Sequence, residues 1–130
     1  MAIIHNLETL IHRTGATYIA VMKVDKAKKL LSCIASYKLP EELVAITNPL
    51  DDTTMNGKVW NSGDFIIANS LDKLILGHRI TAILIAPIKQ DDEVIGTIEL
   101  ISILPDKKFS SDDLNIVKLF IKKEGSSLLR

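Results

Sequence analysis

The chain has 130 residues, of which 47% are hydrophobic and 25% charged, and its 16 basic residues balance 16 acidic ones. This profile is typical of one globular domain over residues 1–130, and without a net positive charge nucleic acid is not an expected partner. The apolar runs are too short to span a membrane, no secretory pattern opens the chain, and Cys33 has no disulfide partner. We therefore expect a cytoplasmic protein.

The first third of the chain predicts a helix followed by a hairpin. Apolar residues recur at helical spacing over residues 3–11, and Gly15 follows as a stop. Residues 17–25 and 30–37 are rich in β-branched and aromatic side chains, with a short polar turn between them. These two segments are therefore predicted to pair as antiparallel strands.

Two short helices are predicted next. Proline is tolerated in a first helical turn, so Pro40 is expected to open a helix over residues 41–46. Thr53 or Thr54 is a suitable N-cap for a second helix, and Gly63 is a suitable C-terminal cap for it.

The second half of the chain predicts strands and a closing helix. Residues 65–68 are predicted as a short strand, and residues 71–76 as one helical turn. Residues 81–88 and 93–103 predict a second hairpin with apolar residues on both faces, so both faces of the sheet must be covered. A helix follows Ser110, and its apolar arc is wider than docking on a sheet requires, so part of it is expected to meet another subunit.

Glu99 is the most informative polar residue because its neighbours in the strand over residues 93–103 require burial. A carboxylate taken out of water is costly unless it is paired or faces a cavity. Glu99 is therefore expected either to form a structural ion pair or to face a ligand pocket.

The element order α-β-β-α-α-β-β-β-α and two local patterns resemble a GAF domain. The first pattern combines residues 86–88, residues 94–100, Phe109 and Asp113, and the second spans residues 57–67. The resemblance implies an α+β, profilin-like fold with an antiparallel sheet of order 2-1-5-4-3. It places the terminal helices on one face and a pocket under short helices and loops on the other. It also implies a small-molecule sensor that forms a homodimer and regulates an output domain of a parent protein or a separate signalling partner.

The chain departs from several branches of this family. Ser102 and Ile103 replace the Asn-Lys pair of cyclic-nucleotide-binding members, and Leu114 replaces a glutamate, so cyclic nucleotides are disfavoured. Cys33 has no second thiol to resolve a sulfenic acid, as reduction of methionine sulfoxide would require, and it lies outside the segment where bilin pigments attach. Cys33 is instead expected to be a buried structural thiol.

No motif in the chain supplies a phosphate-binding loop or a nucleophile elbow, and His5 and His12 lack further metal ligands. The expectation is a domain that is no enzyme and takes no cofactor or metal. The alternative to a sensor is a dimerisation or protein-interaction module whose pocket is filled by its own side chains. The candidate ligand-binding residues are Glu99, Thr97, Tyr37, Trp60, Met55, Phe65 and His78, and the candidate dimer-interface residues are Ile4, Ile11, Ile116 and Phe120.

Overall fold

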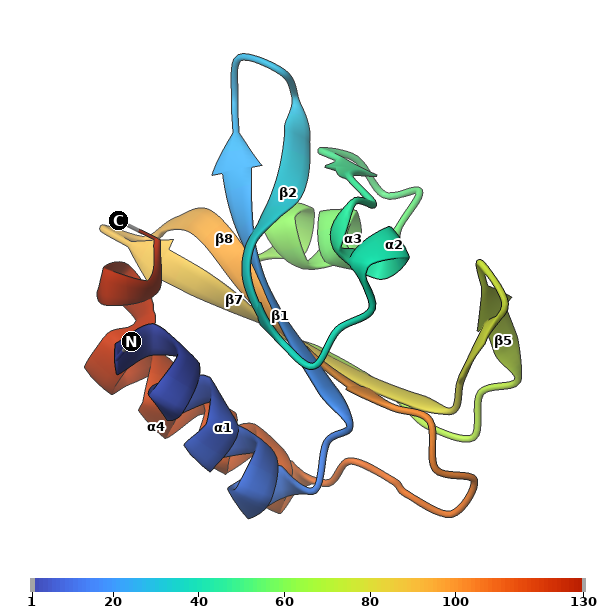
Figure 1. Ribbon diagram of the computed structural model, residues 1–130. Helices are drawn as coiled ribbons and strands as arrows, with labels where there is room; N and C mark the ends of the chain where they lie inside the picture. Colours follow the sequence, from blue (N-terminus) through green and yellow to red (C-terminus); the bar gives the residue numbers. More distant parts are fainter. Residues whose placement is uncertain (1, 130) are drawn as a thin grey trace.

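A curled antiparallel sheet separates two layers of helices and loops (Figure 1). The computed structural model describes residues 2–129, with side chains described from Asn6 onward apart from Ser126. The predicted α+β class is confirmed. In chain order, the elements are α1 Ala2–Thr14, β1 Tyr18–Asp25, β2 Leu30–Tyr37, α2 Glu41–Val44, β3 Asn48–Pro49, α3 Met55–Ser62, β4 Ile66–Ala68, β5 Lys73–Ile75, β6 His78–Ile80, β7 Ala82–Gln90, β8 Glu93–Ser102 and α4 Ser111–Leu128.

The main sheet has six strands in the order β3-β2-β1-β8-β7-β4. Its central strands β1, β8 and β7 pair antiparallel, with β2 and β4 on either side of them. The two-residue β3 extends one edge by pairing with β2, and the sequence does not predict it. The predicted hairpins over residues 17–37 and 81–103 are both present.

A separate two-stranded sheet joins β5 and β6. The prediction of a helical turn over residues 71–76 is wrong, because β5 occupies most of this segment. Leu76 and Gly77 have φ values of 49° and 83°, a left-handed turn that reverses the chain into β6.

The terminal helices α1 and α4 lie side by side on one face of the sheet (Figure 1). Leu7 and Leu10 of α1 and Val117 of α4 pack there against buried residues of the strands. Ser110 begins α4 with the two hydrogen bonds of a capping box: its side chain accepts from the backbone N–H of Asp113, and its own N–H donates to the Asp113 carboxylate. No helix within residues 2–129 has the length and apolar character needed to cross a bilayer.

The helix α3 lies against the opposite face of the sheet, beside α2 (Figure 1). As predicted, the Thr54 side chain caps α3, and Gly63 ends the helix with a φ of 72°. Gly57 allows the close approach of α3 to the preceding loop, because a Cβ there would lie 1.9 Å from the Asp51 carbonyl oxygen. The N-terminal turn of α3 is thus fixed close to the loop that precedes it.

The side chains of β8 alternate between these two layers. Ile98 and Leu100 belong to the core under α1 and α4, whereas Ile101 belongs to the cluster on the α3 side. Glu99 shares the parity of Ile101, and its strand neighbours in the sheet are Ala20 and Ile85. The pleat therefore places the Glu99 carboxylate at the centre of the sheet, on the face that α3 covers.

Candidate functional site

A cavity of about 380 Å³ lies between the sheet and the layer formed by α2, α3 and the β5–β6 hairpin. We call it the central pocket. Apolar side chains make up more than half of its walls, and seven polar or charged side chains lie among them. Such a mixture of apolar surface and polar groups suits a small-molecule site. It is lined by Ala20, Met22, Cys33, Leu39, Leu43, Ile46, Asn48, Thr53, Thr54, Met55, Asn56, Lys58, Lys73, Ile75, Ile80, Ile83, Glu99 and Ile101.

A relay of two hydrogen bonds leads to Glu99. The Thr97 hydroxyl donates to Asn56 Oδ1 over 2.7 Å, and Asn56 Nδ2 donates to Glu99 Oε1 over 3.2 Å. Thr97 and Asn56 are 0% and 4% exposed, so water does not compete for these bonds. Because the Thr97 hydroxyl can donate only to the amide oxygen, it orients the amide group so that its NH₂ faces Glu99. The relay holds one oxygen of the carboxylate in place.

The second oxygen of Glu99 is open to the central pocket. Among the described residues, Glu99 has no cationic side chain within 4.0 Å. Its hydrogen bond from Asn56 reaches Oε1, and every fully buried side-chain oxygen or nitrogen of the described residues has a hydrogen-bond partner, so an unpartnered Oε2 is not fully buried. Oε2 therefore retains contact with the space of the pocket. Burial raises the pKa of Glu99, and the Asn56 hydrogen bond and the positive charge of Lys73 oppose this shift. The structure thus places Glu99 at a cavity and not in an ion pair.

Cys33 lines the central pocket and is only partly buried. Its Sγ donates to the Ala35 carbonyl oxygen over 3.3 Å. Burial raises the pKa of the Cys33 thiol, and the Glu99 carboxylate contributes to the same shift. The expectation of a buried thiol is corrected, because this side chain is only partly buried and lines the pocket. The raised pKa favours the thiol over the nucleophilic thiolate.

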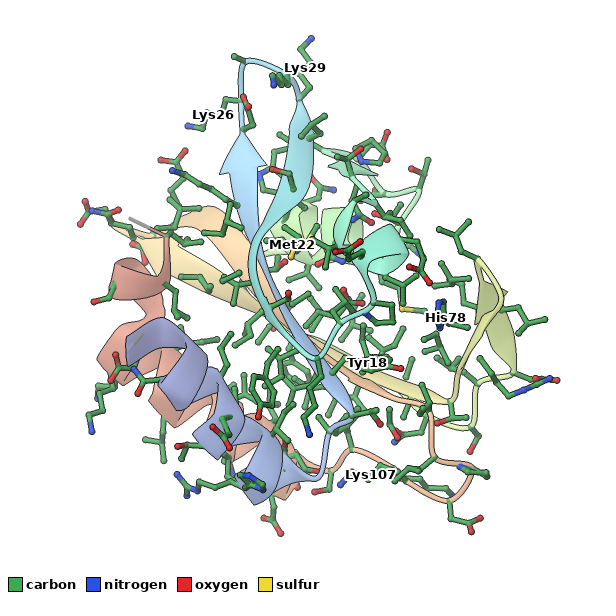
Figure 2. All side chains as sticks on the ribbon, in the orientation of Figure 1. Tyr18, Met22, Lys26, Lys29, His78 and Lys107 are labelled. Carbon is green, nitrogen blue, oxygen red and sulfur yellow. The ribbon has the colours of Figure 1, made fainter. Side chains whose placement is uncertain are left out.

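His78 joins the β5–β6 hairpin to α2 through Glu42. Its Nε2 lies 2.6 Å from Glu42 Oε1, and the hydrogen bond lowers the pKa of Glu42. Figure 2 shows His78 between the hairpin and α2. The contact connects two elements that both border the pocket, although they are 36 residues apart in the sequence.

The structure brings four of the seven predicted ligand-binding residues to the pocket or its immediate support. Glu99 and Met55 line it, Thr97 positions Asn56, and His78 connects two elements that contribute lining residues. Trp60 packs behind the wall against the cluster of Ala20, Met22 and Leu31, and is not among the lining residues.

Two aromatic residues predicted for the pocket lie elsewhere, so these predictions are corrected. Tyr37 packs against the core under the terminal helices, where desolvation and then the Glu8 carboxylate of α1 raise its pKa. The register between β1 and β2 shifts between Val21 and Met22, because β2 has one extra residue at this point. The side chains of β2 beyond the extra residue, including Tyr37, therefore point to the opposite face of the sheet from the one that strict alternation predicts. Phe65 is 39% exposed and lies beside α4, outside the central pocket.

Asn56, which holds Glu99, is a lining residue that the sequence analysis does not predict, as are Lys58 and Lys73. It shares the inward face of α3 with Val59, and both are buried. Asparagine is unfavourable inside a helix unless its side chain finds a specific partner. Its spacing of three residues from the apolar Val59 places it on the inward face of the helix, which indicates a buried polar contact.

The predicted dimer-interface residues do not share one environment. Ile11 is buried in the core and cannot contact a partner subunit, which corrects that prediction. Ile116 and Phe120 are half-buried and border a groove between α1 and α4, and the side chain of Ile4 lies outside the described residues. Leu119, which the sequence reasoning did not select, lines the same groove and is 63% exposed.

Comparison with protein families finds one match: the model of the GAF domain matches residues 5–122. A comparison with curated protein sequences finds no match.

Among the described residues, no group of three or more histidine, cysteine or acidic side chains is arranged to hold a metal ion.

Solved structures with the same fold include GAF domains, part of a chemotaxis protein and a reductase. The GAF domain region of a putative membrane protein from Geobacter sulfurreducens PCA is similar with a TM-score of 0.80 at 14% identity, over 98% of this chain and 90% of that one. A methyl-accepting chemotaxis protein fragment has a TM-score of 0.76 at 18% identity, over 97% and 85%. Free methionine-R-sulfoxide reductase from Neisseria meningitidis, solved with its substrate, has a TM-score of 0.71 at 17% identity, over 92% and 71%. At these identities the similarity establishes the fold alone.

Proposed function

Since the chain belongs to the GAF domain family, we propose that it is a non-catalytic regulatory domain of a cytoplasmic signalling protein and senses a small metabolite in the central pocket. The observation that carries this proposal is the open oxygen of Glu99. A half-buried carboxylate without an ion-pair partner is unfavourable in an empty protein, and a ligand that supplies a hydrogen-bond donor removes this cost.

The lining residues indicate the chemistry of the ligand. A compact molecule fits best if an amine, amide or hydroxyl group donates to Glu99 Oε2 and an apolar part contacts Met22 and Ile83. Lys58 and Lys73 also line the pocket and supply positive charge for an acceptor group on the same molecule. We assign no catalytic residue, because the one cysteine at the pocket has no second thiol to resolve an oxidised intermediate.

Binding is proposed to act on a dimer. The groove between α1 and α4 is bordered by Leu119, Ile116 and Phe120. A second copy of the chain that covers this groove would bury the exposed Leu119 side chain. A ligand that draws α2, α3 and the hairpin together on one face of the sheet then shifts the population of dimer arrangements on the other face. In the parent protein this shift would reach an output domain or a signalling partner.

The proposal is tested by screening the purified domain against a mixture of amine-containing and amide-containing metabolites, with detection by ligand-observed NMR. For any metabolite that binds, Glu99→Gln is expected to weaken binding by about 10- to 150-fold, which corresponds to the loss of ~1.5–3 kcal/mol from a charged hydrogen bond. The matched control is Glu93→Gln, which changes an exposed carboxylate of the same strand. Equal affinities for the two variants would contradict the role of Glu99, and the absence of any ligand would favour the interaction module.

A further inference from the structure

A second concavity lies beside α4 and β7, and it shares no lining residue with the central pocket. It has a volume of about 450 Å³ and is bordered by α4, by β7 and by the turn between α3 and β4. We call it the lysine groove. It is lined by Gly63, Asp64, Phe65, Ala86, Pro87, Lys89, Lys118, Ile121 and Lys122.

The sheet topology explains why this space is open. The pairing of the edge strand β4 with β7 ends where Ile66 meets Ile85, so β4 does not cover β7 from Ala86 onward. The turn that contains the left-handed Gly63 borders this space, and the Lys89 side chain of β7 reaches it, with Nζ 3.5 Å from where a Cβ of Gly63 would lie. Pro87 has no N–H to offer on this uncovered edge, which disfavours addition of another strand. The groove is therefore built for side-chain contacts with a ligand and not for strand pairing.

Three ammonium groups from two elements converge on the groove without acidic partners. Lys89 comes from β7, and Lys118 and Lys122 come from consecutive turns of α4. Within residues 2–129 none of the three has a carboxylate within 4.0 Å, and Asp64 contributes the one acidic side chain of the lining. This excess of positive charge is local, since the whole chain has a net charge of zero.

Apolar surface accompanies the charges. Phe65 is 39% exposed, and the Lys118 ammonium lies 5.2 Å from the centre of its ring. Ala86, Pro87 and Ile121 add aliphatic surface to the lining. An apolar surface beside several ammonium groups suits an organic molecule that carries more than one negative charge.

We propose that the lysine groove is a second binding site, separate from the central pocket, for a small organic polyanion with two or more phosphate or carboxylate groups. Lysine binds phosphate as a point charge, and a multivalent anion relieves the mutual repulsion of the three ammonium groups. The volume of the groove falls in the range of small-molecule sites. Because the ammonium groups are exposed, binding weakens as the ionic strength rises.

The test is an NMR titration of the ¹⁵N-labelled chain at low ionic strength with inorganic pyrophosphate, with ADP and with adenosine. Pyrophosphate and ADP are expected to shift the amide signals of residues 63–65, 86–89 and 118–122, whereas uncharged adenosine leaves these signals unchanged. The double variant Lys89→Gln/Lys122→Gln is expected to weaken the binding of both anions by about tenfold or more.

Two further variants separate a specific site from general charge attraction. Lys28→Gln/Lys108→Gln removes the same net charge from exposed lysines outside the groove and is expected to leave the affinity unchanged. Asp64→Asn removes the one carboxylate of the lining and is expected to strengthen binding about two- to fivefold, a gain that misfolding would not produce. Equal weakening by the two double variants, or the absence of shifts in the groove, would overturn the proposal. Binding of an acidic peptide without binding of either anion would also overturn it, in favour of a protein-docking surface.

Discussion

Glu99→Gln is expected to leave the ligand-free domain as stable as the original or to stabilise it by up to about 2 kcal/mol at neutral pH. Glutamine keeps an oxygen to accept from Asn56 Nδ2, so the hydrogen bond persists in neutral form. The change loses ~1 kcal/mol, the difference between a charged and a neutral hydrogen bond. It recovers ~1–3 kcal/mol, because a neutral amide costs less to bury than a carboxylate does.

The same substitution predicts a change in the pH dependence of stability. Because burial raises the pKa of Glu99, the folded protein binds the proton of this carboxyl more tightly than the unfolded chain does. The resulting stabilisation is complete at pH values below the pKa that Glu99 has in the unfolded chain. It is lost as the pH rises through the higher pKa that Glu99 has in the folded protein. The advantage of Glu99→Gln over the original protein should therefore grow as the pH rises through the folded pKa and then stay constant.

Thermal unfolding of both proteins over a series of pH values measures this effect. In a domain of 130 residues, 1 kcal/mol corresponds to about 3–5 °C in Tm. If Glu99 instead balanced a buried cation, Glu99→Gln would destabilise the domain by about 3–5 kcal/mol and lower the Tm sharply. That result would show that the Glu99 carboxylate is half of an ion pair and does not face the pocket without a partner.

Three further predictions follow from packing and surface contacts. Gly57→Ala should lower the free energy of unfolding in urea by about 1–3 kcal/mol, since its Cβ would lie 1.9 Å from the Asp51 carbonyl oxygen; unchanged stability would mean that α3 can move away from the loop. Leu119→Glu should convert a dimer into monomers in sedimentation velocity, while Lys108→Glu, outside the groove between α1 and α4, should not. An original protein that is monomeric at high micromolar concentration would contradict this prediction. His78→Ala should speed amide exchange in β5 and β6 and leave β8 unchanged, because the contact with Glu42 is lost; unaltered exchange in the hairpin would show that this contact does not hold it.

Elements with local signals could be predicted from the sequence. The capping residues Thr54 and Ser110 and the C-terminal cap Gly63 lie where the pattern places them, because each acts within a few residues of itself. The strand β3 could not be predicted, since two residues form it only when β2 lies alongside. The β5–β6 hairpin was missed because its short leucine-rich segment suits a helical turn equally well.

The site shows the same division between local and long-range information. Glu99 was identified because a carboxylate among apolar strand residues is anomalous wherever it points. Asn56 was missed because its partner Glu99 is 43 residues away and Thr97 is 41 residues away. The facing of Tyr37 depends on the register shift between β1 and β2, which the alternation of residues within one strand does not reveal. Residues of matching parity, Cys33 and Tyr37, consequently lie on opposite faces of the sheet.

The most direct test of the sensor function is native mass spectrometry of the domain purified under gentle conditions. The account predicts that a small molecule co-purifies with the original protein and with Glu93→Gln, and that its occupancy falls in Glu99→Gln and in Ala20→Leu, which fills part of the central pocket. A bound molecule whose occupancy is the same in all four proteins would contradict binding at this pocket. A domain that carries no molecule and binds none from a metabolite mixture would contradict the sensor function itself.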